Sequence, residues 1–538
     1  MTLSPWANSI YLSKYSMDGK EEWPDTAHRV ATTVLGALGY QEKSDEVYEV
    51  RKLLFERKFL PGGRYLYATG RGLHQVNNCL LLRAEDSREG WSELLQKASM
   101  ALMTGAGIGV DYSQVRESGA PIRRTGGLAS GPISLMQMVN EVGRHVMQGG
   151  SRRSAIWAGL RWDHPDIMSF IRIKDWSPEV RALKEKDFNF PGTMDMTNVS
   201  VILDDEFFEV YHNRYHMKNA LAQEVYWKAL EKMGRTGEPG FSIDTGANSG
   251  ETLRNACTEL TSYDTDDICN LGSLNLARFD NREDFATAVD LATLFLLAGT
   301  VYSHVPYPEV AEVREKNRRL GLGLMGVHEW LLQRDRQYGP DIELDRWLRE
   351  YATSTEWAAE WADIHSLSRP VKTRAIAPTG TISIVAETTS GIEPLFCTSY
   401  KRRYLASGNG WKTQLVVDPV AKRLIEQGVP AGDIEDAYSL SYDVERRIGF
   451  QAWMQGYVDH GISSTINLPA PLGYEESVEY GKMLLKYLPR LRGLTSYPNG
   501  ARGGQPLTPI PLDMAMQHEG VVFESEEALC NAVGVCGT

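Results

Sequence analysis

Short apolar runs bounded by glycine or polar residues alternate with longer amphipathic stretches from Pro61 onward. The apolar runs are 78–82, 108–110, 198–203 and 383–386, and the amphipathic stretches include 131–147 and 221–233. Short apolar runs suit buried strands, whereas apolar residues three and four apart suit helices. This alternation predicts an α/β fold with much parallel strand pairing. Residues 25–60 carry helical periodicity instead, which predicts a helical N-terminal region.

The bulk composition excludes several classes of protein. The chain has 538 residues, of which 42% are hydrophobic and 24% charged, and this is typical of a soluble globular protein. No continuous apolar run is long enough to span a membrane, and the first residues lack a secretory signal, so we expect a cytoplasmic protein without membrane contact. The net charge of −13 argues against a nucleic acid as partner, since phosphate backbones require dense lysine and arginine. A nucleotide monomer needs only a local pocket.

Asn255, Cys257 and Glu259 lie in the segment Asn-Ala-Cys-Thr-Glu, which brings an amide, a thiol and a carboxylate into one short loop. On an extended loop, side chains two residues apart point the same way, so the three could face one substrate. That combination suits chemistry on a diol. A lone cysteine is often a small buried hydrophobic residue, but the neighbouring carboxylate and a second cysteine at position 269 favour a functional role.

The other five cysteines differ in their surroundings. Cys79 and Cys269 each begin a strand-like apolar run, so adjacent strand ends could bring them together as a reversible disulfide, although their contact stays open. Cys530 and Cys536 are spaced too far apart for a C-x-x-C zinc site, and a mobile dithiol there could reduce an internal disulfide by exchange. The alternative is two cysteines without a role. Cys397, in Leu-Phe-Cys-Thr-Ser-Tyr, belongs to no polar constellation and is expected in the core.

Three patterns resemble cofactor or metal sites, but their surroundings do not support them. Residues 321–326, Gly-Leu-Gly-Leu-Met-Gly, match a dinucleotide-binding pattern, but a charged segment precedes them, so we expect the glycines to permit close helix packing. Asp363 and His365 match only the start of a cobalamin-binding pattern, so we expect His365 to be structural. Asp25 and His28 have no second carboxylate and histidine pair, so no metal centre is expected on this chain.

The motifs around Cys257 resemble those of the catalytic subunit of ribonucleotide reductase. The likeness rests on Asn-x-Cys-x-Glu, on Cys-Asn-Leu-Gly-Ser-Leu-Asn-Leu beginning at Cys269, on the upstream pair Asn78 and Cys79, and on the C-terminal cysteine pair. Supporting matches occur in the order of the family at 61–64, 106–109, 125–132, 148–153 and 377–383. Each match alone is weak, but together they are highly specific.

This resemblance implies a fold and a division into domains. A ten-stranded α/β barrel with a central finger loop would occupy residues 61–510. The helical N-terminal region, 1–60, would lack the ATP-sensing domain of some relatives, because Cys79 lies too near the N-terminus, so we expect no overall inhibition by dATP. A flexible redox tail, 511–538, would follow the barrel.

The resemblance also implies catalytic roles. Cys257 would become a thiyl radical that abstracts the 3′ hydrogen of the ribose, Glu259 would take the 3′-hydroxyl proton, and Asn255 would hold the ribose hydroxyls. Cys79 and Cys269 would protonate the departing 2′ hydroxyl, supply two electrons and end as a disulfide. The tail cysteines would reduce this disulfide and be recycled by thioredoxin or glutaredoxin.

Two nucleotide sites follow from the same resemblance. A ribonucleotide substrate, either a diphosphate or a triphosphate, is expected to bind at Asn78, Ala106, Gly107, Pro378, Thr379, Gly380, Thr381 and Ile382. The small and hydroxyl-bearing residues 378–383 would let backbone amides surround a phosphate. A deoxynucleotide effector at a homodimer interface would bind at Asp86, Arg116 and Arg123. Residues 173–197 would link the effector to the choice of substrate.

The sequence leaves two types of reductase possible, and these types differ in the source of the radical. The glycyl-radical type is excluded, since it needs a different C-terminal motif and has no need of Glu259. Types that use a separate metal-bearing subunit carry adjacent tyrosines where this chain has Ser496 and Tyr497. This missing tyrosine and the sequence of 378–382 favour adenosylcobalamin as the cofactor. The sequence of 106–111 favours a radical-generating subunit, which stays the alternative. A non-catalytic nucleotide-binding or thiol-exchange protein is the alternative of another class.

Overall fold

The computed structural model describes residues 3–123, 126–147, 154–187, 190–405, 411–499, 507–524 and 529. Cys530 and Cys536, the predicted tail pair, therefore lie outside the described residues. Part of the family match at 125–132 and all of the match at 148–153 also lie outside them.

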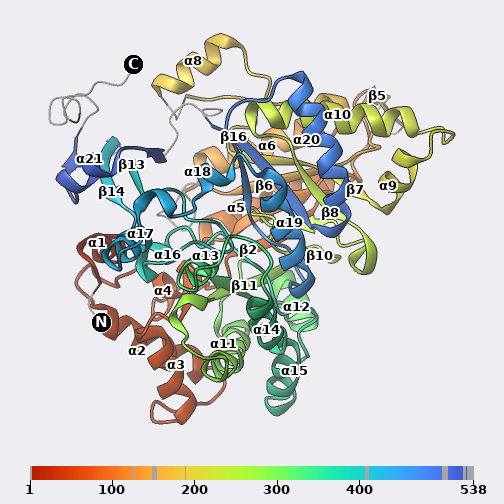
Figure 1. Cartoon of the computed structure of the whole chain (residues 1–538). Helices are drawn as coiled ribbons and strands as arrows, with labels where there is room; N and C mark the ends of the chain where they lie inside the picture. The colour runs from red at the N-terminus through yellow and green to blue at the C-terminus, as the bar shows by residue number, and fades with distance from the viewer. Residues whose placement is uncertain are drawn as a thin grey trace.

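The core of the molecule is a sheet whose strands form two sets of opposite direction (Figure 1). In the first set all neighbours are parallel, in the order β2 (Cys79–Arg83), β3 (Gly107–Asp111), β6 (Ile156–Arg161), β7 (Thr197–Asp204) and β8 (Gly240–Asp244). The second set includes two parallel pairs, β11 (Asp267–Asn275) with β12 (Leu320–Met325) and β15 (Thr465–Leu468) with β16 (Gly493–Pro498). The sets meet antiparallel where β11 pairs with β2 and β16 pairs with β8.

The segment 372–377 closes the sheet into a barrel. Parallel bridges join Leu322 of β12 to Arg374, and Ile376 to Ile462, which leads into β15. The backbone N–H of Ile376 donates to Gly461 at 3.1 Å, so this segment provides the tenth strand of the ring. The ten-stranded α/β barrel that the sequence predicted is confirmed. A further short strand, β1 (Phe59–Pro61), extends the sheet antiparallel to β11.

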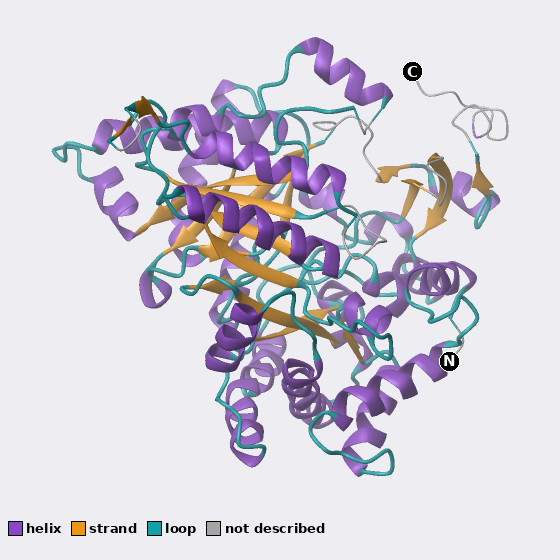
Figure 2. Ribbon diagram, turned by 180° about the vertical axis from the view of Figure 1, so that it is seen from behind, coloured by secondary structure: helices purple, strands orange, loops and turns teal. Residues whose placement is uncertain are grey.

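Helices cover the outside of the barrel, both on the half around β2 to β8 and on the half around β11 and β12 (Figure 2). On the first half these are α5 (Arg88–Thr104), α6 (Pro132–His145), α10 (Asn219–Thr236), α19 (Val444–Met454) and α20 (Tyr474–Tyr487). On the second half they are α11 (Arg282–Tyr302), α14 (Ile342–Ala352) and α15 (Ser354–Ile364), and α12 (Pro308–Asn317) packs against β11. Helix α5 shows why such segments form: the Ser87 hydroxyl caps its first turn at 2.9 Å, Gly105 ends it at a φ of 111°, and one apolar face is buried.

The N-terminal region is helical, as its periodicity indicates. It contains α1 (Pro5–Lys14), α2 (Trp23–Gly36) and α3 (Asp45–Phe55). Val30 and Val34, one turn apart on α2, are fully buried. Both α2 and α3 pack against α11, so this region shares a hydrophobic core with the second half of the barrel.

Helix α11 is the one helix in the described ranges that is long and apolar enough to cross a membrane by length and composition. Most of it is buried inside the protein, because it packs against β11, β12 and the helices around them. We interpret it as a central core helix of the second half.

Two local predictions are wrong. The apolar run 383–386 was expected as a strand, but it forms the short helix α16 (Ile382–Ala386). The glycines of 321–326 do not pack against a helix. Gly321 and Gly323 lie in strand β12, where a Cβ at Gly323 would be 2.6 Å from the Ala375 carbonyl oxygen, and Gly326 directly follows this strand. Glycine at this position lets the closing segment approach β12.

A small four-stranded sheet lies beside the barrel (Figure 1). Its strands, in order, are β17 (Leu507–Pro509), β13 (Ser399–Leu405), β14 (Trp411–Val417) and β18 (Val522–Phe523). Helices α17 (Pro419–Glu426) and α21 (Leu512–Gln517) lie next to it. Helix α21 and strand β18 fall within 511–538, so part of the predicted tail has regular structure, and its redox role stays a prediction.

A hairpin projects into the barrel between β8 and β11. Its strands are β9 (Leu253–Arg254) and β10 (Thr261–Ser262), and β9 contacts β2, β3 and β6 inside the barrel. The central finger loop is therefore present. The hairpin fits inside the barrel because the strand beside it has glycine at the point of contact. A Cβ at Gly109 of β3 would lie 1.8 Å from the Arg254 carbonyl oxygen.

Gly109→Ala is expected to displace the finger hairpin, since backbone rather than a movable side chain occupies the site of the new methyl group. We expect a loss of about 1–3 kcal/mol in the free energy of unfolding, measured by urea denaturation. Gly432→Ala is the matched control, because a Cβ there meets no atom within 4 Å. Equal stability of the two variants would contradict the packing described here.

Candidate active site

The tip of the finger loop is held by Asn255, which is fully buried. The backbone N–H of Thr258 donates to the Asn255 carbonyl at 3.0 Å, and the N–H of Leu260 donates to the Asn255 side-chain oxygen at 3.0 Å. Thr258 has a φ of +67°, so the tip is not an extended strand. The expected alternation of side chains is therefore only partly observed: Cys257 and Glu259 face one cavity, whereas Thr258 faces another.

Cys257 and Glu259 face a cavity of about 300 Å³, here called the thiol cavity. Most of the predicted substrate residues line it as well, namely Asn78, Gly107, Pro378, Thr379, Gly380, Thr381 and Ile382. Ala106 does not: its side chain is fully buried in the hydrophobic core outside β3. Successive residues at the start of a strand face opposite ways, so Gly107 reaches the cavity and Ala106 cannot.

Cys79 and Cys269 are direct partners across the antiparallel pair β2 and β11. Opposite residues in such a pair have Cα atoms about 4.5–5.5 Å apart, which is within the range that a disulfide spans. All four cysteines in the described part of the chain are free thiols. Cys79 lines the thiol cavity, whereas Cys269 is fully enclosed behind it. The structure thus brings together the two cysteines that the sequence paired.

Burial keeps these thiols protonated. It raises the pKa of Cys79, and the Glu259 charge raises it further, against a smaller lowering effect of the hydrogen bond that Asn255 donates to Cys79 Sγ at 3.0 Å. Burial, followed by the Glu259 charge, also raises the pKa of Cys257. For Cys269 burial and the Asp267 carboxylate act in the same direction. A protonated thiol can give a hydrogen atom or a proton, but it is a poor nucleophile.

Glu259 is a buried carboxyl group that forms no ion pair with any residue the structure describes. Burial raises its pKa from the ordinary value of 4.5 to about 7, so it can exchange a proton near neutral pH. Its Oε2 atom has no hydrogen-bond partner among the described residues, and neither has Oδ1 of Asn78. Two unpaired acceptors therefore lie on the wall of one cavity, which suits a ligand that carries hydroxyl groups.

A second cavity, of about 160 Å³, lies on the other side of the finger loop. Ala256 and Cys257 line both cavities, so the Cys257 residue stands in the wall between them. Thr495 and Tyr497 of β16 line the second cavity. Ser496, between them, is buried and shares a hydrogen bond with the Tyr480 hydroxyl. The sequence did not predict this cavity, because its other wall residues come from distant segments, among them β6, β7, β8 and 462–465.

The loop 378–382, the predicted phosphate site, turns sharply at Thr379. Thr379 has a φ of +51°, its carbonyl accepts from Ser383 N at 2.9 Å, and its hydroxyl accepts from Gly391 N at 2.9 Å. Gly380 faces open space. The loop is thereby held rigidly at the edge of the thiol cavity.

The predicted effector residues lie away from the thiol cavity. Asp86 and Arg116 form an ion pair of 2.7 Å, and Arg123 is exposed in the turn between the short strands β4 (Pro121–Ile122) and β5 (Gly127–Leu128). In the segment 173–197, of which 188 and 189 are not described, Asp195 pairs with Arg144 of α6 at 2.6 Å. The role of these residues stays a prediction.

Sequence reasoning missed a buried ionic network at the base of the finger loop. Arg319 donates to Asp267 at 2.6 Å and pairs with Glu251 at 3.2 Å, and Lys372 also pairs with Glu251. Thr261 of β10 donates to Glu251 at 2.6 Å. The network joins the hairpin to the start of β11, two residues before Cys269. These charges are dispersed along the chain without a local motif, so no sequence signal identifies them.

The histidines of the discarded metal and cobalamin patterns contact other side chains of the protein. His365 lies within 3.2 Å of the Tyr40 hydroxyl, and His28 approaches Glu42 at 3.7 Å. Among the residues that the structure describes, no three histidine, cysteine, aspartate or glutamate side chains cluster as metal ligands would.

Comparison with known proteins assigns the family. The model of the ribonucleotide reductase barrel domain matches residues 77–233, 212–347 and 368–487. A vitamin B12-dependent ribonucleoside-diphosphate reductase of Mycobacterium tuberculosis is 28% identical, covering 86% of this chain and 73% of the relative. A protein of Mycobacterium phage D29, named as an adenosylcobalamin-dependent ribonucleoside-triphosphate reductase, is 29% identical, covering 92% and 93%.

The solved alpha subunit of the class Id ribonucleotide reductase of Actinobacillus ureae has the same fold. Its TM-score is 0.73 at 16% identity, over 92% of this chain and 97% of that one. Because the family model matches more than half of the residues, this chain belongs to the ribonucleotide reductase family.

Proposed function

We propose that this chain catalyses the reduction of ribonucleotides to 2′-deoxyribonucleotides with Cys257 as the radical-bearing residue. The observation that carries the proposal is the thiol cavity, which collects Cys257, Cys79, Glu259 and the unpaired Asn78 oxygen beside a phosphate-binding loop. Family membership and the relatives, which are named as ribonucleoside-diphosphate and ribonucleoside-triphosphate reductases, support it.

The proposed chemistry uses each group in the protonation state that the barrel interior favours. A radical on Cys257 removes the 3′ hydrogen, and Glu259, whose pKa is about 7, accepts the 3′-hydroxyl proton. Cys79, which faces the cavity, gives its proton to the departing 2′ hydroxyl, which leaves as water. Cys269 gives its hydrogen to the 2′ carbon, and Cys79 and Cys269 together supply two electrons and become a disulfide. Glu259 then returns its proton to the 3′ oxygen and Cys257 returns the hydrogen to the 3′ carbon, so atoms and electrons balance. Asn255 positions the loop and the Cys79 sulfur.

We further propose adenosylcobalamin as the radical source, as in the relatives named as B12-dependent. When bound, it supplies an organic radical by cleavage of its cobalt–carbon bond. Cys257 lines the second cavity as well as the thiol cavity, and the second cavity shares Ser463 and Thr465 with an outer cavity of about 350 Å³. The residues shared by the two cavities would hold the cofactor at the face of Cys257 opposite the ribose.

The alternative radical source is a separate metal-bearing subunit. Such a source needs a path for the radical through adjacent tyrosines. In this chain Ser496 occupies one position of the pair, and its hydroxyl is bonded to Tyr480. This break in the path favours adenosylcobalamin.

Re-reduction of the disulfide is assigned to Cys530 and Cys536, with thioredoxin or glutaredoxin as the external reductant. Cys79 is the sulfur that such a dithiol can reach from the cavity, since Cys269 is enclosed. We also propose a deoxynucleotide effector at Asp86, Arg116 and Arg123 on a homodimer, and a cytoplasmic location.

Replacement of the radical cysteine separates catalysis from binding. Cys257→Ser is expected to abolish turnover while the dissociation constant for a ribonucleotide stays within about twofold, because serine preserves the cavity but forms no stable radical. Turnover and equilibrium dialysis measure the two quantities. Cys397→Ala, in a buried cluster outside the site, is the control and retains turnover. Turnover by Cys257→Ser would contradict the role of Cys257, whereas wild-type protein that binds the ribonucleotide without turnover would favour a non-catalytic nucleotide-binding or thiol-exchange protein.

The radical source is tested with purified protein, one ribonucleotide, a dithiol and adenosylcobalamin, with no second subunit. We expect deoxyribonucleotide to form, and to be absent when adenosylcobalamin is omitted. Absence of product in the complete mixture, followed by activity on addition of a metal-bearing subunit, would assign the alternative source.

Glu259→Gln is expected to abolish turnover and to change the pH dependence of stability. Between pH 4.5 and 7 the folded protein holds a proton on Glu259 that the unfolded chain has lost, so this residue lowers stability progressively as pH rises. Above pH 7 the variant should exceed wild type by up to about 3 kcal/mol in the free energy of unfolding. Urea denaturation at pH 5 and pH 8 measures this difference. The exposed substitution Glu475→Gln is the control, and an unchanged difference between the two pH values would contradict the assignment.

A further inference from the structure

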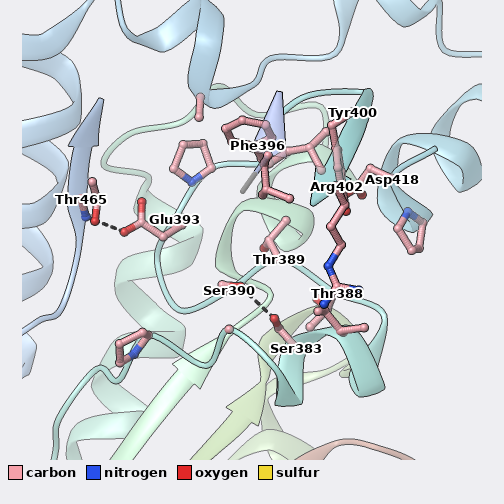
Figure 3. A pocket seen from close by; sticks show the side chains of 18 of the residues that line it. Ser383, Thr388, Thr389, Ser390, Glu393, Phe396, Tyr400, Arg402, Asp418 and Thr465 are labelled. Atoms are coloured by element: carbon pink, nitrogen blue, oxygen red, sulfur yellow. Dashed lines mark hydrogen bonds between the residues drawn. The ribbon is translucent and has the colours of Figure 1, made fainter. Parts of the chain in front are cut away.

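The outer cavity, of about 350 Å³, lies between the loop 378–380 and the hairpin formed by β13 and β14 (Figure 3). It shares Pro378 and Gly380 with the thiol cavity and Ser463 and Thr465 with the second cavity. A molecule in either inner cavity can therefore extend into it. Neither the predicted substrate site nor the catalytic residues account for its remaining walls.

Arg402 of β13 reaches into this cavity as a cation without an anion (Figure 3). Its guanidinium lies 5.6 Å from the ring centre of Trp6 and 4.9 Å from that of Tyr404. Within the described ranges it has no ion pair with a carboxylate. Burial lowers its pKa, and only two tyrosines oppose that effect. Charges removed from water are normally paired, so this arginine lacks the partner that such sites require.

The carboxylates on the cavity wall already have partners of their own. Glu393 pairs with Arg447 at 2.7 Å, and Glu387 pairs with Arg57 at 2.7 Å. Asp418 accepts a hydrogen bond of 2.8 Å from the backbone at the start of α17, and burial raises its pKa to about 7. These groups therefore do not neutralise Arg402, and two of the three are neutralised by arginines of their own.

Hydroxyl groups line the same cavity below Arg402 in this view (Figure 3). Ser383 and Ser390 share a hydrogen bond of 2.8 Å, and Thr388 and Thr389 complete the group. Hydroxyls can turn to donate to an incoming oxygen, and a guanidinium fork matches two oxygens of one phosphate. The cavity thus combines a fixed cation with adaptable donors.

We propose that Arg402 binds a phosphate group in the outer cavity. The inference rests on the proposed function, because two phosphate sources can reach this position. One is the terminal phosphate of a nucleotide whose ribose lies over Cys257, reached past Pro378 and Gly380. The other is the phosphodiester of a cobalamin, reached past Ser463 and Thr465. In the first case Arg402 contributes to the choice between diphosphate and triphosphate substrates.

The test measures dissociation constants by equilibrium dialysis for wild type, Arg402→Gln and Arg402→Lys. The probes are one ribonucleoside as its mono-, di- and triphosphate, and hydroxocobalamin. Arg402→Gln removes a charged hydrogen-bond donor, so the dissociation constant of the probe whose phosphate contacts Arg402 should rise about 10- to 100-fold. Arg402→Lys should restore part of this affinity. Arg214→Gln is the control, since Arg214 stacks on Tyr215 at 5.0 Å on an exposed surface. Thermal unfolding verifies that each variant is folded.

The outcomes distinguish the sources. Weaker binding of the di- or triphosphate, with the monophosphate and hydroxocobalamin unchanged, assigns the substrate phosphate. Weaker binding of hydroxocobalamin alone assigns the cobalamin phosphodiester. Unchanged constants for every probe in a folded Arg402→Gln variant overturn the inference and leave the proposed function intact. Wild-type protein that binds neither class of probe would overturn the proposed function itself.

Discussion

The passage of the finger hairpin through the barrel is the constraint on which the site depends. It requires backbone to approach backbone, which only missing side chains permit: a Cβ at Gly109 would meet the Arg254 carbonyl oxygen, and a Cβ at Gly461 would lie 2.9 Å from the Thr258 carbonyl oxygen. The hairpin places Cys257 between two cavities, and β11, which follows it, places Cys269 opposite Cys79. One topological feature therefore positions both the proposed radical thiol and the proposed reducing pair.

The same enclosure determines the electrostatics. Removal from water raises the pKa of the thiols and of Glu259, so the cavity contains neutral hydrogen donors and one carboxyl group that can change its charge near neutral pH. At the base of the hairpin the charges are fully paired instead, through Arg319, Asp267 and Glu251. We interpret the paired charges as the rigid support and the unpaired carboxyl group as the reactive part.

Much of the site could be predicted from the sequence, because the chemistry depends on short motifs. The spacing of Cys257 and Glu259 indicated a shared cavity, and the strand-like runs after Cys79 and Cys269 indicated neighbouring strands. The backbone turn at Thr258 was not predictable, since a positive φ in a threonine has no local signature. The contacts of Arg402 and of the ionic network were not predictable either, because they join segments that only barrel closure brings together.

The central claim is that Cys257 carries the radical that begins catalysis. Electron paramagnetic resonance tests it most directly, on protein labelled with β-deuterated cysteine and frozen rapidly after mixing with ribonucleotide and adenosylcobalamin. We expect a radical signal that narrows on deuteration, because the cysteine β hydrogens couple to an electron on sulfur, and that disappears in Cys257→Ser. A signal of unchanged width in the labelled protein, or one that persists in Cys257→Ser, would contradict it.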